Sequence, residues 1–202
     1  MSRRFRGDAG QAFPIYVVMV AGLLFLAFAF FAVGKASALR NGSQGAADAA
    51  ALAAAQRART EMGPGFIASL RGNTLELFLG STFAPPCADA GRLASANGAD
   101  TRACYPEHGY LRDRITVEVE GRKSVDSSVI PGTQNTFAKA KATALIEFRC
   151  PNWKAVDANS DGVPELFIFT CSNGRVVEIV PASPPPWSTV SKILFDVRLV
   201  DQ

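Results

Sequence analysis

The chain has 202 residues, a length that suits one small domain together with an anchoring segment. Its formal net charge of +3 is too small, and most of its basic residues are too scattered, to indicate a nucleic-acid-binding protein. Four cysteines and a single histidine leave little material for a metal centre or a catalytic nucleophile. We therefore expect neither a nucleic acid nor a small-molecule substrate as a partner.

An uncharged run at residues 9–34 is the first strong feature of the chain. Its core, FPIYVVMVAGLLFLAFAFFAVG, is long enough to cross the ~30 Å hydrocarbon layer as a helix. A secretory signal peptide is one alternative, but its hydrophobic region usually has only about 7–15 residues; a buried core helix is another. Phenylalanines surround the helix axis, so no polar stripe remains. We therefore expect a transmembrane helix at 11–34, after a short head at 1–10.

The charges that flank this run predict its orientation. Arg3, Arg4 and Arg6 precede it, with only Asp8 against them, whereas the far side opens with few basic residues. The positive-inside rule then favours a cytoplasmic N-terminus and a single pass through the cell membrane. Everything after the span is expected outside the cytoplasm.

An alanine-rich segment, residues 35–62, follows the span. Alanine is the strongest helix former, and no proline interrupts the segment before MGPG at 62–65, so we expect one helix of about fifty residues. Small residues spaced four apart make a flat face that another helix or a sheet can approach closely; these are Ala46, Ala50, Ala54 and Ala58. The alternative is that the alanines reflect helix propensity alone.

These N-terminal features together carry a family resemblance. A basic head, Gly10 before the span, the apolar helix and AADAAALAAA at 46–55 resemble the N-terminal region of TadE/TadG-like proteins, pilin-like components of bacterial tight-adherence (Flp) pilus assembly. The segment CADAGRLASANGADTRAC is similar to a second pattern in that group. The resemblance implies a membrane-anchored structural protein whose partners are other pilus-assembly or pilin-like proteins. The element that begins at Asp48 is the most specific part of the resemblance, and our working prediction places helix packing at Ala46, Asp48, Ala50 and Ala54.

The chain departs from processed prepilins at one position. Those proteins carry glutamate at the fifth residue after the cut, whereas a cut after Gly10 would place Ile15 there, and the span contains no acid. We therefore expect no pilin-type processing. The departure favours a minor or assembly component over the bulk fibre subunit.

All four cysteines follow the span, at positions 87, 104, 150 and 171. An even number in an oxidising compartment predicts two disulfides, whose three possible pairings the sequence does not separate. A zinc site is less consistent with the spacing, because no close Cys-x-x-Cys pair is present. Our working prediction joins Cys87 to Cys104 around a local helix and turn. It joins Cys150 to Cys171 on the condition that the connector 151–164 returns along the sheet.

The exported part, residues 63–202, reads as a small mixed domain. We expect a short helix at 87–97, and strands in RITVEVEGRK, TFAKAKATALIEFRC, ELFIFT, RVVEIV and KILFDVRLV. The first two strands should pair antiparallel with Glu118 and Glu120 near Lys139 and Lys141, and ELFIFT suits a central strand. The predicted class is α+β: a long N-terminal helix, transmembrane and then alanine-rich, with a small antiparallel sheet domain, the general plan of pilin-like folds.

The acidic stretch DANSDGVPE, residues 157–165, is the sharpest chemical motif. Asp157, Asn159 and Asp161 occupy positions 1, 3 and 5 of a calcium loop, and Glu165 occupies position 9. Position 12 is Ile168 instead of the usual bidentate glutamate. A polar turn explains the same residues without any ion. Apart from this possible Ca²⁺ site we expect no cofactor.

Catalytic motifs are absent from the sequence. The single histidine, His108, is expected to be an exposed loop residue, and no nucleophile elbow, phosphate-binding loop or H-E-x-x-H helix is present. Three hypotheses remain, in decreasing order of support: a structural or assembly protein, a membrane-anchored calcium-dependent adhesion or binding module, and an anchored enzyme. We expect that the protein is not an enzyme.

Overall fold

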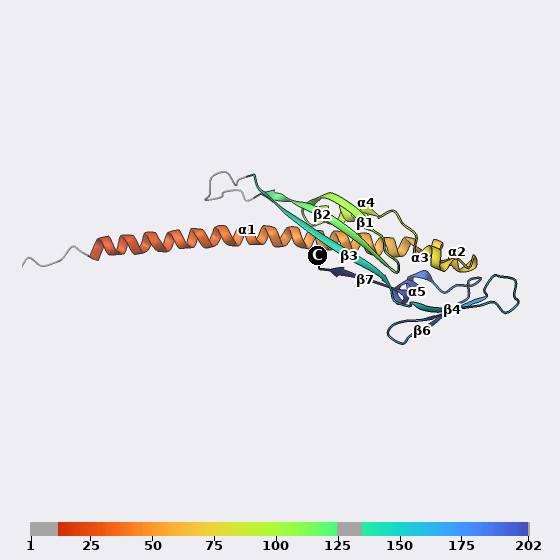
Figure 1. Cartoon of the computed structure of the whole chain (residues 1–202). Helices are drawn as coiled ribbons and strands as arrows, with labels where there is room; N and C mark the ends of the chain where they lie inside the picture. Colours follow the sequence, from red (N-terminus) through yellow and green to blue (C-terminus); the bar gives the residue numbers. More distant parts are fainter. Residues whose placement is uncertain (1–11, 125–134, 202) are drawn as a thin grey trace, which may run out of the picture.

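One long helix organises the whole molecule. The computed structural model describes residues 12–124 and 135–201, and its first element is α1 (Ala12–Glu61), a single helix of 50 residues. The first half of α1 extends away from everything else, and the second half lies along the folded domain (Figure 1). The expected helix of about fifty residues is therefore confirmed, whereas the head at 1–10 lies outside the described residues.

Three short helices follow α1 and lead into the strands. They are α2 (Gly63–Arg71), α3 (Leu75–Leu79) and α4 (Cys87–Ala96). The predicted helix at 87–97 is confirmed, with Asn97 as its C-cap and Gly98 at a φ of +75° that favours glycine. The remaining elements are β1 (Ala99–Glu107), β2 (Arg112–Ser124), β3 (Phe137–Phe148), β4 (Asn152–Val156), β5 (Leu166–Thr170), β6 (Val176–Ile179), α5 (Trp187–Leu194) and β7 (Phe195–Val200).

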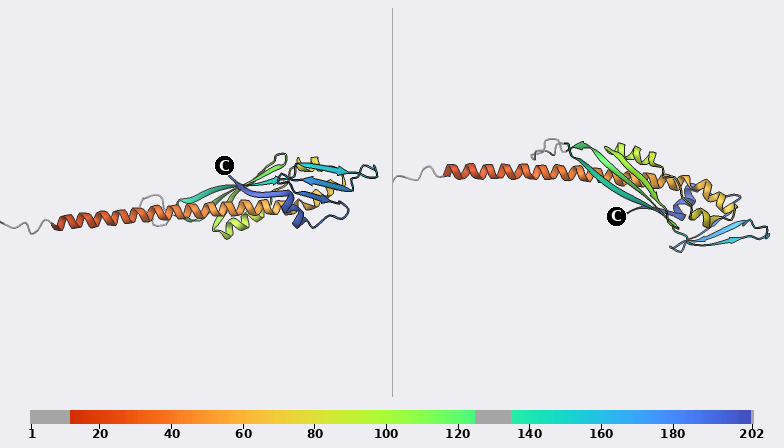
Figure 2. Two further views of the ribbon diagram at one scale, coloured as in Figure 1. Left: turned by 90° about the horizontal axis from the view of Figure 1, so that it is seen from below. Right: turned by 45° about the horizontal axis from the view of Figure 1, so that its top comes forward.

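The main sheet has four antiparallel strands in the order β1-β2-β3-β7 and packs against the second half of α1 (Figure 2). In the pairing of β2 with β3, Glu118 lies opposite Lys141 and Glu120 opposite Lys139, as predicted. On the face toward the helix, β2 and β3 bury apolar side chains at alternate positions: Ile115, Val117, Val119, Ala142, Ala144, Ile146 and Phe148. The α+β class and the helix-on-sheet plan are confirmed.

A second sheet lies beyond the end of the first sheet that is farther from the free half of α1 (Figure 1). It has three antiparallel strands in the order β4-β5-β6, so β5 is central, as its apolar sequence predicts. The side chains of Phe167 and Phe169 on β5 are fully buried. The sequence predicts one sheet, whereas the structure has two.

An aromatic cluster joins the two sheets to the helices. The ring of Phe66 on α2 lies within 6.0 Å, centroid to centroid, of four neighbours: Phe78, Phe169, Trp187 and Phe195. These rings come from α3, β5, α5 and β7. Because they bury large apolar areas in edge-on and tilted contacts, they fix the second sheet relative to the end of α1.

The turn between α1 and α2 is held by Trp187. The indole Nε1 donates a hydrogen bond of 2.9 Å to the carbonyl of Arg59 in the last turn of α1. A Cβ atom on Gly63 would lie 2.7 Å from the indole ring, so only glycine allows this approach. The predicted stop at 62–65 is therefore observed, and its glycine has a packing role.

One predicted strand begins too early. KILFDVRLV was expected to be a strand throughout, but residues 192–194 form the last turn of α5, and β7 begins at Phe195. Val190 and Leu194 are buried four residues apart, which is the spacing of one helix face. The helical spacing and the alternating strand pattern both include residues 192–194. Burial of Leu194 against the core favours the helix there.

Candidate functional site

The first half of α1 is bare and apolar. Among the residues described, α1 provides the one helix long and apolar enough to cross a membrane. Its large side chains are turned outward: Phe13 is 75% exposed and Phe30 is 74% exposed. Exposed apolar surface on every side of a helix is stable in lipid and costly in water. This half is therefore suited to a bilayer.

The second half of α1 presents alanines that are buried almost completely. Seven of them are exposed by 3% or less: Ala46, Ala47, Ala50, Ala51, Ala54, Ala55 and Ala58. They form two adjacent rows, and the main sheet and α4 lie against this half of the helix (Figure 1). Small side chains on the facing elements, including Ala144 on β3 and Ala94 on α4, are also fully buried. The helix, the sheet and α4 therefore approach one another closely.

The partner of the alanine face thus comes from within the chain. From the sequence, a helix or a sheet could cover Ala46, Ala50 and Ala54, or helix propensity alone could explain them. The structure covers them with the protein's own sheet and α4, so packing is part of their role and no second protein is needed. The second row, Ala47, Ala51 and Ala55, was not predicted, although the sequence places an alanine directly after each member of the first row up to Ala54.

Asp48 lies at the edge of this face and is half-buried. Its carboxylate accepts a hydrogen bond of 2.9 Å from Nε2 of Gln44, and the same Nε2 donates at 3.2 Å to the carbonyl of Lys141 on β3. Asp48 therefore positions Gln44 so that its amide bonds the sheet. This gives the acid of the alanine motif a structural role beside the packing face.

The two disulfides join the cysteines in the predicted pairing. Cys87 at the start of α4 is bonded to Cys104 on β1, with Cα atoms 5.9 Å apart. Cys150 before β4 is bonded to Cys171 after β5. The connector 151–164 contains β4, which pairs antiparallel with β5 so that Asn152 lies opposite Thr170. This hairpin brings both cysteines to one end, which satisfies the condition set for the pair.

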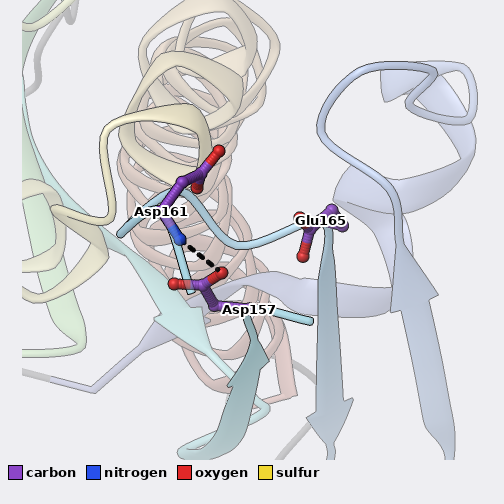
Figure 3. A group of neighbouring side chains, drawn as sticks. All are labelled: Asp157, Asp161 and Glu165. Carbon is purple, nitrogen blue, oxygen red and sulfur yellow. Dashed lines mark hydrogen bonds between the residues drawn. The ribbon is translucent and has the colours of Figure 1, made fainter. Parts of the chain in front are cut away.

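The acidic motif forms the tip of the β4–β5 hairpin (Figure 3). One oxygen from each of Asp157, Asp161 and Glu165 can be chosen so that all three lie within 4.8 Å of one another. Asp157 accepts hydrogen bonds from the N–H groups of Asp161 at 3.2 Å and Gly162 at 2.8 Å, and Asn159 also accepts from Asp161 at 2.9 Å. These bonds build a stable polar turn, and the remaining lone pairs suit a hard cation. Calcium binding stays a prediction.

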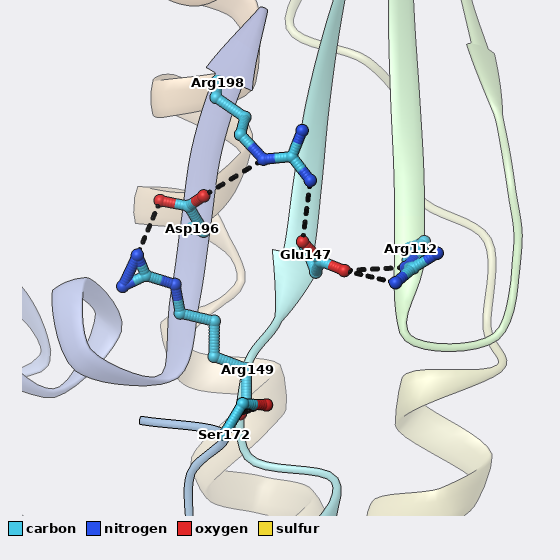
Figure 4. Close-up of polar contacts among 6 residues, drawn as sticks. All are labelled: Arg112, Glu147, Arg149, Ser172, Asp196 and Arg198. Carbon is cyan, nitrogen blue, oxygen red and sulfur yellow. Dashed lines mark hydrogen bonds and ion pairs between the residues drawn. The ribbon is translucent and has the colours of Figure 1, made fainter. Parts of the chain in front are cut away.

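An alternating chain of charges crosses the outer face of the main sheet (Figure 4). Glu147 on β3 accepts from Arg112 on β2 at 2.7 Å and from Arg198 on β7 at 3.0 Å. Asp196 accepts from Arg149 at 3.0 Å and pairs with Arg198 at 3.3 Å. Partial burial alone would raise the pKa of Glu147, but Arg198 and Arg112 outweigh it and hold the pKa below its ordinary value. The network ties β7 to the rest of the sheet.

With this geometry established, comparison with known proteins gives one result. Residues 10–57 match the family model described as Tad: Putative Flp pilus-assembly TadE/G-like. The N-terminal part of this chain is TadE/G-like. No curated protein and no solved structure matches the chain. The predicted resemblance is confirmed over the span and the alanine face, and it supports a role in pilus assembly with membrane association.

The TadE/G-like segment ends within the alanine-rich half of α1. It includes Asp48 and the buried alanines up to Ala55, and it excludes the disulfides, the acidic hairpin tip and the charge network. Those features belong to a domain that the match does not cover. Any role for these features therefore has to be inferred from their geometry alone.

His108 is an exposed residue of the loop between β1 and β2, as expected, and its side chain is 24% exposed. Its Nδ1 lies 3.3 Å from Oδ1 of Asp113, and its ring packs edge-on against Phe83 at 5.1 Å between centroids. Burial raises the pKa of Asp113, although the hydrogen bond and charge of His108 oppose the shift. The pair anchors the segment before α4 to the sheet.

Proposed function

We propose that the chain is a membrane-anchored, pilin-like minor or assembly component of a tight-adherence (Flp-type) pilus or a related secretion apparatus. The observation that carries the proposal is the continuity of α1. Its bare apolar half and its sheet-covered half belong to one helix, and the TadE/G-like match spans both. At about 1.5 Å per residue the helix is about 75 Å long. Such a rod transmits a displacement of the domain directly to the membrane segment.

In this proposal the N-terminus is cytoplasmic and the span is retained. The domain contacts other assembly proteins outside the membrane, where an oxidising compartment preserves both disulfides. Because the chain's own sheet occupies the alanine face, contacts with partners use the apolar half of α1 and the outer surface of the domain. This arrangement separates the residues that fold the domain from those that join the apparatus.

Deletion of the gene, followed by complementation, tests the assembly role. Cells that lack the protein should lose surface fibres or secretion through the apparatus, and the full chain should restore them. A tagged chain should co-purify with other assembly proteins from membranes. Normal fibres in the deletion strain, together with no co-purifying assembly protein, would refute the proposal. Protease added to spheroplasts should remove the domain and leave a stub that begins near Met1; a stub that begins at Gln11 would instead reveal pilin-type processing.

A second candidate function rests on the hairpin tip. The β4–β5 hairpin points away from the free half of α1, so the three carboxylates lie at the membrane-distal end (Figure 1). A calcium-dependent adhesion or binding module would use such a loop. Calorimetric titration of the full chain with Ca²⁺ tests this candidate, with the variant Asp157→Asn/Asp161→Asn as the control. Equal heats for the two proteins would reject it.

A further inference from the structure

The second sheet has an outer face that points away from the core. Phe167 and Phe169 on β5 are fully buried on the opposite face, where the ring of Phe169 packs against Phe66 of α2. Because side chains alternate along a strand, Leu166 and Ile168 point outward, together with their partners on β4 and β6. The apolar residues of this outer face, with Val180 one residue beyond β6, are Val156, Leu166, Ile168, Val176 and Val180.

The outer faces of the two sheets differ in polarity. An antiparallel sheet with one solvated face usually presents polar side chains on that face. The main sheet follows this rule, because the outward residues of β2 include Arg114, Thr116 and Glu118. On the second sheet, by contrast, Val176 is 59% exposed and Val180 is 44% exposed. Exposed apolar side chains gathered on one small sheet are typical of a surface that contacts another molecule.

Two opposite charges flank the centre of the outer face. Lys154 on β4 and Glu178 on β6 both lie opposite Ile168 of β5, so the three residues form one row across the sheet. The two charged residues are two strand spacings apart, about 10 Å. Both are exposed, and within the described part of the chain neither forms an ion pair. A row with a base at one end, an acid at the other and an apolar centre is complementary to the same row reversed.

A second copy of the chain fits this face through a two-fold axis parallel to β5. Rotation about such an axis through Ile168 places Lys154 of each copy opposite Glu178 of the other, and apolar side chains meet between them. A two-fold axis across the strands would instead bring each charge opposite its own kind, which is destabilising. The charges therefore select the axis along the strands. Aligned strands are also a common geometry for two sheets packed face to face.

The selected axis suits two copies anchored in one membrane. The strands of the second sheet run roughly along the direction of α1, and β4 and β6 lie below α1 and the main sheet in Figure 1 (Figures 1 and 2). A two-fold axis parallel to β5 therefore leaves the free halves of both α1 helices pointing the same way, so that they can enter the same bilayer.

We propose that the outer face of the second sheet joins two copies of this chain in a two-fold dimer. The face has three strands of four or five residues, so it measures about 14 Å by about 17 Å. Such a contact is smaller than the ~1,200 Å² that stable soluble complexes bury. The dimer therefore depends on the shared membrane, which raises the local concentration of the two copies. The inference goes beyond the proposed function and does not require a role in pilus assembly.

Energy transfer between full-length chains in liposomes tests the proposal. Donor and acceptor dyes are placed on unnatural amino acids at Gln56, an exposed position of α1. Wild-type chains should transfer energy, and an excess of unlabelled chain should abolish the transfer. Lys154→Glu or Glu178→Lys alone turns both ion pairs of the dimer into like-charge contacts. Because an exposed pair contributes up to about fivefold in affinity, each variant should associate roughly tenfold more weakly or less.

A mixture of the two variants provides the sharpest comparison. Donor-labelled Lys154→Glu and acceptor-labelled Glu178→Lys again bring opposite charges together at both positions, so transfer should return to about the wild-type level. A defect in folding would not be repaired by mixing. The matched control is Lys192→Glu on α5, an equal change of charge outside this face, which should leave transfer unchanged.

Three results would overturn the proposal. They are wild-type transfer no higher than that of Lys154→Glu alone, a mixture that transfers no more energy than its separate components, and an equal loss in Lys192→Glu. Near-ultraviolet circular dichroism of each variant checks that the domain is folded. Because only the purified chain and lipid are present, these outcomes are independent of whether the protein assembles a pilus.

Discussion

The two halves of α1 share one helix but differ in what covers them. In the first half, bulky side chains such as Phe31 are exposed by 68%, whereas in the second half Ala50 and Ala54 have no exposed surface. The buried face of the second half is apolar, as is the whole first half, so these two surfaces differ in side-chain size. Bulky side chains on every side fill the space between lipid chains, whereas alanines let a sheet approach the backbone closely.

The same substitution in each half tests this difference with the largest expected effect. Ala50→Leu/Ala54→Leu adds volume under the sheet and should lower the free energy of unfolding of the domain by roughly 2–6 kcal/mol. Helix propensity changes little, because leucine ranks close to alanine. Thermal unfolding in detergent, followed by near-ultraviolet circular dichroism, measures the loss.

The control for this change lies in the exposed half of the same helix. Ala27→Leu faces outward and should alter the unfolding free energy by no more than about 0.5 kcal/mol. Equal stability of the double variant and the control would show that the alanine face tolerates volume. That result would return the alanines to the role of a stiff spacer.

The second sheet provides the next test, because it packs on the aromatic cluster around Phe66 and not on the alanine face of α1. Replacing Cys150 and Cys171 with alanine removes a bridge across 21 residues and should cost about 2–4 kcal/mol. The loss should be confined to the membrane-distal end, so hydrogen exchange should accelerate at β4 and β5 and stay slow at α1 residues 46–58. Uniform acceleration across both regions would contradict the separation.

Several of these features follow from the sequence, and for physical reasons. The uncharged run and the alanine block predict α1, and the alternation in β2 and β3, together with their opposite charges, predicts the register of that pair. β1 was missed because it contains Pro106, which a strand tolerates at a sheet edge but which weakens the pattern. β4 was not predicted because the strand has only five residues, most of which are exposed.

The partner of the alanine face could not be assigned from the sequence. Ala46, Ala50 and Ala54 indicate close approach whichever surface approaches, and a one-dimensional pattern does not distinguish the chain's own sheet from another protein. The acidic hairpin tip and the charge network also differ in how far the sequence predicts them. The acidic motif is visible in the sequence because its residues lie within nine positions of one another, whereas the network around Glu147 joins β2, β3 and β7, which are brought together only by the fold.

Two glycine-to-alanine substitutions, one next to the end of α1 and one within it, test the packing of Trp187 there. Gly63→Ala places a Cβ atom 2.7 Å from the Trp187 ring and should cost about 1–3 kcal/mol. Gly45→Ala, on the same chain with no atom within 4 Å of the new Cβ, should stabilise the helix by roughly 0.5–1 kcal/mol. If Trp187 holds the end of α1, denaturant unfolding should show a lower free energy of unfolding for Gly63→Ala and a higher one for Gly45→Ala than for the wild type.

The smallest effect is expected on the outer face of the sheet. Glu147→Gln removes a carboxylate whose side chain is 20% exposed, and it should cost about 1 kcal/mol at neutral pH after allowance for screening. The folded-state pKa of Glu147 is lowered, so its contribution is present above the ordinary pKa of 4.5 and is lost as pH falls through the lower folded value. When unfolding is measured as a function of pH, the difference in free energy of unfolding between the wild type and Glu147→Gln should shrink as the pH falls. A difference that persists unchanged well below that range would mean that the substitution destabilises the protein through packing.

A distance measurement tests directly whether α1 is continuous across the membrane boundary. Spin-labelled amino acids at Leu26 and Gln56 lie in the two halves of the helix, and both side chains are exposed. At ~1.5 Å per residue, an unbroken helix places them about 45 Å apart. Pulsed electron paramagnetic resonance on the full chain in nanodiscs should give one narrow distribution centred near that distance. A broad distribution, or a distinctly shorter distance, would show that the helix breaks between its two halves and would contradict the account.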